Sequence, residues 1–213
     1  MFLAAGAIAF GGGCLARSRY ERDCLVTEEY RIVSEKIHGP GKTIVFLTDL
    51  HNKEFGDQNC RLLDAVRKVK PDAVLSGGDG MVAKKGNSDV EIPRKLLTEL
   101  AKEFPVYCGN GNHESRMLWK SEIYGETYEN YRTALENAGI RYLANGSADL
   151  DGEIRIYGLD LPKSAYLPRS GQIPENLLKD ALGEPDPGRF NLLLAHSPLF
   201  FEEYAAWGAD LTL

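Results

Sequence analysis

The chain has 213 residues, of which 43% are hydrophobic, and this is enough for one globular domain with a sizeable core. Its formal net charge is −6 and the sequence shows no basic stripe, which disfavours a general nucleic-acid-binding protein. The four cysteines form no C-x-x-C pair, so neither a zinc ribbon nor a disulfide framework is expected.

The first 16 residues carry no charged side chain and are rich in alanine and glycine. This stretch is short for a membrane span, which needs about 20 residues, and it lacks the basic start of a standard signal peptide. Arg17, Arg19 and Arg22 follow it, and if the stretch is an anchor they would place the body on the cytoplasmic side. Residues 1–27 are therefore interpreted as an apolar leader and linker. Membrane association through residues 1–16 is one hypothesis, and a disordered or truncated leader is the other.

Residues 28–213 are expected to form one domain, and its first half alternates between strands and helices. An edge strand is predicted over residues 30–33, and the continuous apolar run over 43–47 is typical of a strand buried on both faces. Helices are predicted over 57–70, 91–104 and 128–138, and strands over 72–76 and 105–108. This alternating order predicts a parallel sheet with helices on its faces.

The second half contains shorter elements. Strands over 141–145, 148–150 and 153–158, with Asp151-Gly152 as a hairpin signal, predict a second, partly antiparallel sheet. Residues 161–188 are rich in proline and glycine and are expected to form a surface excursion with one short helix near 175–182. A strand over 190–195, a helix over 200–207 and a strand over 209–213 follow. The whole predicts an α/β fold of two packed sheets with helices outside.

Residues with metal-binding side chains follow four of these strands. The four fragments are Asp49-Leu50-His51, Gly78-Asp79, Gly111-Asn112-His113-Glu114 and Ala195-His196-Ser197. In open α/β sheets, ligands bind where parallel strands end, so these side chains are expected to meet at one edge. Each residue alone would be an ordinary turn, cap or surface residue. Four compatible strand ends in order rarely arise by chance.

The residue types suit a pair of metal ions. Asp49 and His51 are two positions apart, so on an extended segment their side chains point the same way and one ion can take both. Asp79 follows two glycines, and its two carboxylate oxygens can bridge two ions. Asn112 and His196 complete a set of oxygen and imidazole ligands without thiolate, which suits Mn, Fe, Zn or Co.

Two such ions about 3.5–4 Å apart clamp a phosphoester and turn bridging water into hydroxide. His113 would then face the substrate, where it protonates the leaving oxygen or stabilises the developing charge. Glu114 is expected to orient His113 from behind. The pattern thus predicts a metal-dependent phosphoesterase with a dinuclear centre.

These fragments resemble the pattern of the calcineurin-like metallophosphoesterases, which is D-x-H, G-D, G-N-H-[DE], a lone H and then G-H-x-H. The sequence matches the first four parts over residues 43–197. The T-D-L-H and L-L-A-H-S-P contexts and the apolar leader resemble the membrane-associated bacterial phosphodiesterase branch. The resemblance implies a four-layer α/β/β/α sandwich with a dinuclear site.

The resemblance also implies a role for each ligand. By position, Asp49 and His51 would bind the first metal, Asp79 would bridge both, Asn112 and His196 would bind the second, and His113 would be the catalytic histidine. The fifth part, G-H-x-H, does not occur among the 213 residues, although residues 210–213 resemble the strand that precedes it in the family. Its two histidines would supply one ligand to each metal. We therefore expect a C-terminally truncated fragment of an enzyme, with a non-catalytic metal-binding member of the same fold as the alternative.

The expected partner is a phosphoester, either a small molecule or a lipid. Lipid-linked pyrophosphates, nucleotides and cyclic nucleotides all fit such a core, because loops set the specificity of these folds. No nucleic-acid partner is indicated. The expected location is the membrane, on its cytoplasmic side, or otherwise the cytoplasm.

Overall fold

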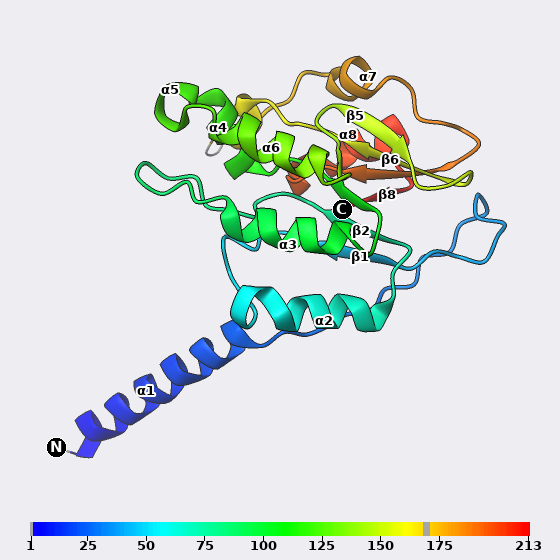
Figure 1. The fold of residues 1–213 in the computed structure, drawn as a ribbon. Helices are drawn as coiled ribbons and strands as arrows, with labels where there is room; N and C mark the ends of the chain where they lie inside the picture. The colour runs from blue at the N-terminus through cyan, green and yellow to red at the C-terminus, as the bar shows by residue number, and fades with distance from the viewer. Residues whose placement is uncertain (1, 168–170) are drawn as a thin grey trace.

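The computed structural model describes residues 2–167 and 171–213 (Figure 1). Met1, which belongs to the predicted leader, and residues 168–170, which belong to the predicted excursion over 161–188, lie outside the described residues.

Four parallel strands form the first sheet, in the order β1-β2-β3-β4. They are β1 (Ile44–Leu47), β2 (Ala73–Ser76), β3 (Val106–Cys108) and β4 (Arg141–Tyr142). The connections contain the 3-10 turn η1 (Asp57–Asn59) and the helices α2 (Cys60–Val69), α3 (Glu91–Ala101), α4 (Asn112–Trp119), α5 (Ser121–Tyr124) and α6 (Thr127–Asn137). Parallel strands must be joined by crossover connections, which are usually helices. This requirement explains why strands and helices alternate along the first half of the sequence.

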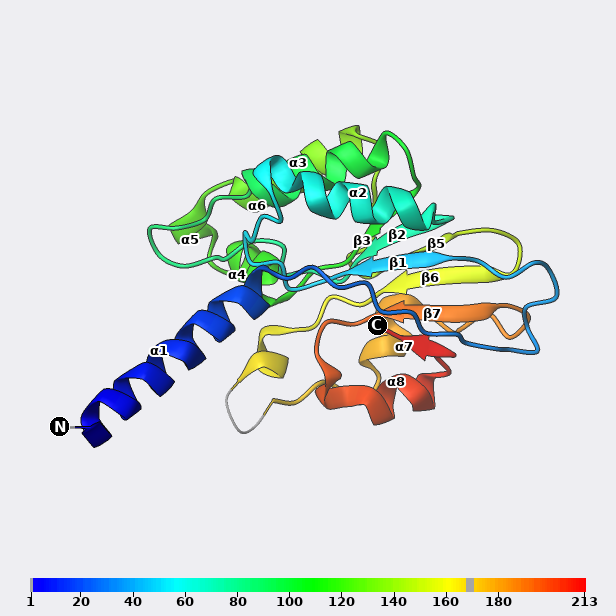
Figure 2. The same ribbon diagram turned by 90° about the horizontal axis from the view of Figure 1, so that it is seen from below.

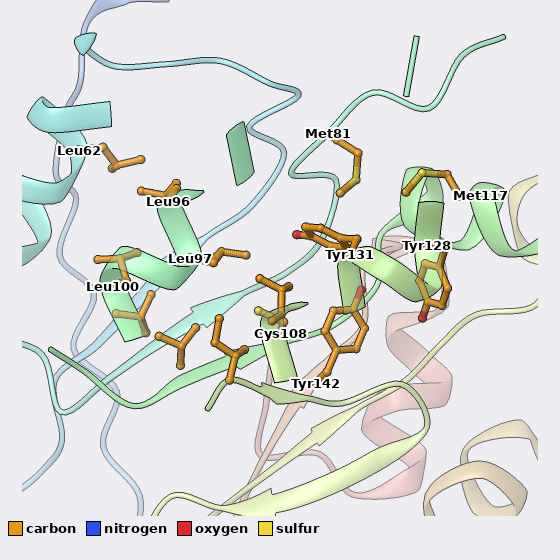
Figure 3. Packing of buried hydrophobic residues seen from close by; sticks show 14 of the residues in the cluster. Leu62, Met81, Leu96, Leu97, Leu100, Cys108, Met117, Tyr128, Tyr131 and Tyr142 are labelled. Carbon is orange, nitrogen blue, oxygen red and sulfur yellow. The ribbon is translucent and has the colours of Figure 1, made fainter. Parts of the chain in front are cut away.

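The helices α2, α3 and α6 cover the outer face of this sheet because each has one apolar stripe. Leu96, Leu97 and Leu100 on α3 are buried against residues of the sheet such as Cys108. Figure 3 shows this packing, with Tyr131 of α6 and Leu62 of α2 in the same cluster. The first core therefore lies between one helical layer and one face of the sheet.

The second sheet has the order β5-β6-β7-β8. Its strands are β5 (Gly146–Asp149), β6 (Ile154–Gly158), β7 (Phe190–Leu194) and β8 (Leu211–Thr212). The pair β5-β6 is antiparallel and the other two pairs are parallel. The second sheet is thus partly antiparallel, as the sequence predicts. The 3-10 turns η2 (Lys163–Tyr166) and η3 (Pro198–Phe200) and the helices α7 (Leu177–Leu182) and α8 (Phe201–Trp207) follow its strands. The Asp151 carboxylate accepts hydrogen bonds from the N–H groups of Glu153 and Ile154 (2.8 and 2.9 Å), which forms the expected hairpin turn.

The two sheets pack face to face, with helices outside both (Figures 1 and 2). Side chains alternate along a strand, so Leu75 of β2 points between the sheets while its neighbour Val74 points toward the helices. Leu75 meets Ile156 and Leu192 of the second sheet in the central core. On the far side, Leu193 of β7 packs against α7 and α8. The predicted four-layer α/β/β/α sandwich is confirmed.

Three local predictions are wrong. Residues 30–33 form no strand, since the chain has no partner strand there, and Tyr30 and Val33 are 80% and 82% exposed. The strand β1 is half-buried rather than buried on both faces, because it is an edge strand that pairs only with β2. The strand β4 pairs with β3 in the first sheet and not with the strands of the second.

The N-terminal residues form one helix, α1 (Phe2–Asp23), which projects away from the body (Figures 1 and 2). The helix includes residues 17–23, for which the sequence predicts a linker. Among the described helices, none combines the length and apolar character needed to cross a membrane.

Leu135 of α6 is fully buried in the first core, so truncation at this position leaves a cavity. We expect Leu135→Ala to lower the free energy of unfolding by about 2–5 kcal/mol, measured by denaturant titration. The matched control is Val33→Ala, an exposed site where a change within about 0.5 kcal/mol is expected. Equal stability of the two variants would contradict this description of the core.

Candidate metal centre

The loops that follow β1 and β2 are joined by backbone hydrogen bonds beyond the ends of the strands. The Asp49 N–H donates to the Gly78 carbonyl at 3.1 Å, and the His51 N–H donates to the Asp79 carbonyl at 3.0 Å. These bonds hold Asp49 and His51 beside Asp79. The His51 Nε2 atom lies 3.6 Å from Asp49 Oδ1 and 3.9 Å from Asp79 Oδ2.

The expected extended segment over Asp49 and His51 is wrong, although the two side chains do meet. Asp49, His51 and Asp79 have φ angles of 54°, 49° and 51°, in the left-handed region that side chains disfavour. The hydrogen bonds to the neighbouring loop hold this conformation in place. Strained backbone of this kind concentrates at functional sites, so the conformation itself supports a functional assignment.

Two glycines allow the loops after β2 and β3 to approach closely. A Cβ atom on Gly78 would lie 2.0 Å from the Gly111 nitrogen, and one on Gly111 would lie 2.3 Å from Asp79 Oδ1. Gly78 also has a φ of 93°. The glycines that precede Asp79 and Asn112 are therefore required by the packing of the two loops.

The Asp79 carboxylate is the centre of the cluster and is only 2% exposed. Its Oδ1 atom accepts a hydrogen bond from the His113 N–H, in the first turn of α4, at 2.8 Å. Its Oδ2 atom lies 3.4 Å from His196 Nε2 and 3.9 Å from His113 Nε2. The side-chain amide of Asn112 lies 3.2 Å from the same Oδ2 atom. With His51, four side chains from three separate segments thus converge on one oxygen.

These donors fit divalent metal ions. Two overlapping groups of ligand atoms lie within 4.8 Å of one another, one from His51, Asp79 and His113 and one from Asp49, Asp79 and His196. Carboxylate oxygens with imidazole nitrogens suit first-row divalent ions. The Asn112 amide satisfies its hydrogen bonds with its N–H₂ group donating to Asp79 Oδ2 at 3.2 Å and its oxygen accepting from the His113 N–H at 3.2 Å. Rotation of this amide would present its oxygen to a cation beside Asp79.

The ring of His196 is held with its Nε2 atom toward Asp79, because its Nδ1 atom lies 3.0 Å from the Gly77 carbonyl and can donate to it. Burial opposes a charge on this ring, but the hydrogen bond and charge of Asp79 outweigh burial and raise the pKa of His196 to about 9. A metal that binds Nε2 must displace the proton held there.

The ring of His113 is held from the opposite side. Its Nδ1 atom accepts the Ala83 N–H at 2.9 Å and lies 3.4 Å from Arg116 Nη1. Burial lowers the pKa of His113 despite the attraction of Asp79, and the Arg116 charge adds to this effect. The neutral ring therefore carries its proton on Nε2, the atom that faces Asp79.

Glu114 does not orient His113, and that prediction is wrong. Its buried carboxylate accepts the N–H groups of Asp79, Gly80 and Gly111 at 2.9, 3.1 and 3.0 Å. The carboxylate of Glu114 is occupied by these three backbone donors and not by His113. Since the donors come from the loops after β2 and β3, Glu114 links these two loops. Burial, followed by repulsion from Asp79, raises the pKa of Glu114 to about 7.

Two further residues, Asp160 and Asn110, hold α4 and the loop before it in place and were missed by the sequence reasoning. The hydroxyl of Ser115 donates to Asp160 Oδ1 at 2.7 Å, and Asp160 follows the end of β6. Asn110 donates to the hydroxyl of Tyr128 at 3.0 Å and accepts from that of Tyr142 at 2.5 Å. Asp160 follows a predicted strand just as the ligands do, so this signal could have been found. Nothing in the sequence distinguishes Asn110 from a turn residue.

A model of the calcineurin-like phosphoesterase family matches residues 42–213, from just before β1 to β8 and beyond it. The match covers most of the chain, and the chain belongs to this family. No curated protein matches it.

In Glu114→Gln the single amide oxygen can accept at most two of the three buried backbone N–H groups, and the N–H₂ group then faces at least one N–H donor. An unsatisfied buried donor costs about 1–3 kcal/mol, so we expect a loss of stability in that range and weaker metal binding. Denaturant titration and metal titration measure the two effects. The matched control is Glu175→Gln, at an exposed position outside this network. Wild-type stability and metal affinity in Glu114→Gln would contradict the role given to this carboxylate.

The metal-free chain should lose stability as the pH rises from about 6.5 to about 9, because His196 binds its proton more tightly in the folded state. This contribution is fully present below about pH 6.5 and is lost as the pH rises through the folded pKa. We expect His196→Gln to flatten the dependence of the unfolding free energy on pH in this window, while the exposed His38→Gln keeps it. A slope that is unchanged in His196→Gln would show that the proton is held elsewhere.

Proposed function

We propose that this chain is a metal-dependent phosphoesterase that cleaves phosphodiester or pyrophosphate bonds with two divalent ions, Mn, Fe, Zn or Co, held around Asp79. Its membership of the calcineurin-like phosphoesterase family supports phosphoester hydrolysis in general terms. The observation that carries the proposal is the buried Asp79 Oδ2 atom, which faces the Nε2 atoms of three histidines at 3.4–3.9 Å. An acceptor surrounded by ligand atoms from separate loops is suited to bridging two cations.

In this proposal the ligands divide around Asp79. Asp49 and His51 would hold the first ion, Asn112 and His196 would hold the second, and Asp79 would be a ligand of both. The contact of 3.6 Å between Asp49 and His51 supports this division. Asp49 also lies within 4.8 Å of the ligand atom of His196, so it faces both sides of Asp79. The bound ions would polarise the phosphoryl group and supply an activated water. The chain itself fixes its ligands on rigid loops and excludes solvent from Asp79.

His113 is proposed to contact the substrate through its Nε2–H group. The Nδ1 atom of His113 accepts the Ala83 N–H. If the ring were protonated, its Nδ1–H group would point at the Ala83 N–H group, and the two donors would repel each other. This bond favours a neutral ring that donates to the charge developing on a phosphoryl or leaving oxygen, rather than a ring that transfers a proton. The substrate in this proposal is a phosphoester of a small molecule or a lipid.

Asp79→Asn removes the charge shared by both ions, so we expect metal-dependent hydrolysis of bis-p-nitrophenyl phosphate to fall by about 100-fold or more, the scale on which charge-stabilising groups act. Elemental analysis should show reduced metal content in the same variant. The matched control is Asp180→Asn, an exposed position on α7. This variant should keep the hydrolysis rate and the metal content of the wild type.

Two outcomes would overturn the proposal. Hydrolysis that is unaffected by Asp79→Asn would place the chemistry elsewhere. Metal uptake by the wild-type chain without turnover would instead favour a non-catalytic metal-binding protein of the same family.

A further inference from the structure

The guanidinium of Arg116, on α4, lies beside the metal centre. Its Nη1 atom donates to the Ala83 carbonyl at 3.0 Å and lies 3.4 Å from Nδ1 of His113. The Nε2 atom of the same imidazole lies 3.9 Å from Asp79 Oδ2. The Arg116 side chain is half-buried. Its positive charge is therefore held one imidazole ring away from the carboxylate at the centre of the site.

The charge of Arg116 is not neutralised by a carboxylate in the described part of the chain. Within the described part of residues 28–213, five other arginines do pair with one, namely Arg67, Arg94, Arg132, Arg155 and Arg189. A guanidinium carries five N–H donors in a planar fork, and the contact with Ala83 uses only Nη1. Arg116 thus keeps donors and a full charge for an anion at the site.

Two lysines follow the residue that holds both Arg116 and His113. Ala83 donates its N–H to His113 Nδ1 at 2.9 Å, and Lys84 and Lys85 come directly after it, with exposed side chains. Two backbone hydrogen bonds between Lys84 and Asn87, both 2.8 Å, close the turn that carries them. The loop from β2 to α3 extends on the side of the molecule where α4 and α5 lie (Figures 1 and 2). Three cationic residues therefore border the His113 side of the metal centre.

The His51 side of the metal centre has the opposite charge. Asn52, the residue after His51, donates its side-chain N–H to the Asp89 carbonyl at 3.0 Å. The residues that line the pocket at this place include four carboxylates and one cation, namely Glu54, Asp57, Asp89, Glu91 and Lys95. An anionic part of a substrate is repelled from this side and attracted to the side of His113.

We propose that Arg116, with Lys84 and Lys85 beside it, binds a second phosphoryl group of the substrate, so that the leaving group is itself a phosphate. This inference rests on the proposed function, in which His113 donates to a phosphoryl or leaving oxygen. In a pyrophosphate ester the leaving oxygen belongs to the second phosphoryl group, which then lies against His113 and next to the guanidinium. A planar guanidinium matches two phosphoryl oxygens and stabilises the charge that the leaving phosphate gains.

The reaction is the hydrolysis of a pyrophosphate ester. The oxygen of water bonds to one phosphorus, and the bond from that phosphorus to the bridging oxygen breaks. The bridging oxygen leaves on the second phosphoryl group, whose added negative charge faces His113 and Arg116. The two hydrogens of the water end on the two product phosphates, so two phosphate monoesters form and no other reactant is needed.

Two substrates that differ by one phosphoryl group test the proposal. Diadenosine pyrophosphate joins two adenosines through two phosphoryl groups, and adenylyl-adenosine joins them through one. The full chain is assayed with each substrate in Mn²⁺, as the wild type, Arg116→Met and Arg116→Lys. We expect kcat/KM for diadenosine pyrophosphate to fall about tenfold or more in Arg116→Met, the scale of one hydrogen bond to a charged group, and to recover in part in Arg116→Lys. For adenylyl-adenosine the change should stay within about threefold.

The matched control is Arg31→Met, which removes an exposed arginine from the segment before β1 and should hydrolyse both substrates as the wild type does. The double variant Lys84→Gln/Lys85→Gln leaves Arg116 and the backbone bonds of the turn in place. We expect it to raise the KM for diadenosine pyrophosphate about threefold at low salt and to have no effect at high salt, because salt screens exposed charges. Circular dichroism confirms that all variants are folded.

An equal fractional loss for the two substrates in Arg116→Met would overturn the proposal, because it would show that Arg116 acts only by positioning Ala83 and His113. A wild type that prefers adenylyl-adenosine would overturn it as well. Equilibrium dialysis of diadenosine pyrophosphate separates this proposal from the proposed function. If the wild type hydrolyses neither compound, the proposed function fails, whereas weaker binding by Arg116→Met than by the wild type still supports the second phosphoryl site and equal binding contradicts it.

Discussion

The buried carboxylate of Glu114 holds the loops on which the metal centre depends. It accepts backbone N–H groups from Asp79, Gly80 and Gly111, and it lies close enough to Asp79 for their charges to repel. Two buried carboxylates side by side are costly unless donors and positive charge compensate them. Glu114 receives the donors, while Asp79 faces imidazoles and would face cations. The site is therefore arranged to attract positive charge to Asp79 Oδ2.

The fold brings the ligands to this carboxylate from both sheets. β1, β2 and β3 end at one edge, and β7 of the second sheet ends there too and supplies His196. The loops then interlock, since Gly78 and Gly111 leave no room for a Cβ atom between them. Because the loops also share backbone hydrogen bonds, the ligand geometry is set by the packed sheets rather than by the flexibility of any one loop.

Much of this arrangement could be predicted from the sequence, because strand periodicity and polar strand ends are local signals. They predicted two packed sheets with helices outside and the convergence of Asp49, His51 and Asp79, and the family resemblance added the four-layer order. The left-handed backbone at Asp49 and His51 could not be predicted, since its cause lies in hydrogen bonds to a loop about 30 residues away. The hydrogen-bond partners of Glu114 were missed because two of them lie in that same distant loop. The strand β4 has only two residues, so its sequence pattern does not indicate which sheet it joins.

The central claim is that Asp79 Oδ2 is the shared ligand of two divalent ions. Anomalous diffraction from crystals grown with Mn²⁺ tests it most directly. The account predicts two anomalous peaks that flank Asp79 Oδ2, one near His51 and one near His196, with the Asn112 amide oxygen turned toward the second. Peaks at other residues, or an Asp79 that remains hydrogen-bonded to a protonated His196 in saturating Mn²⁺, would contradict it.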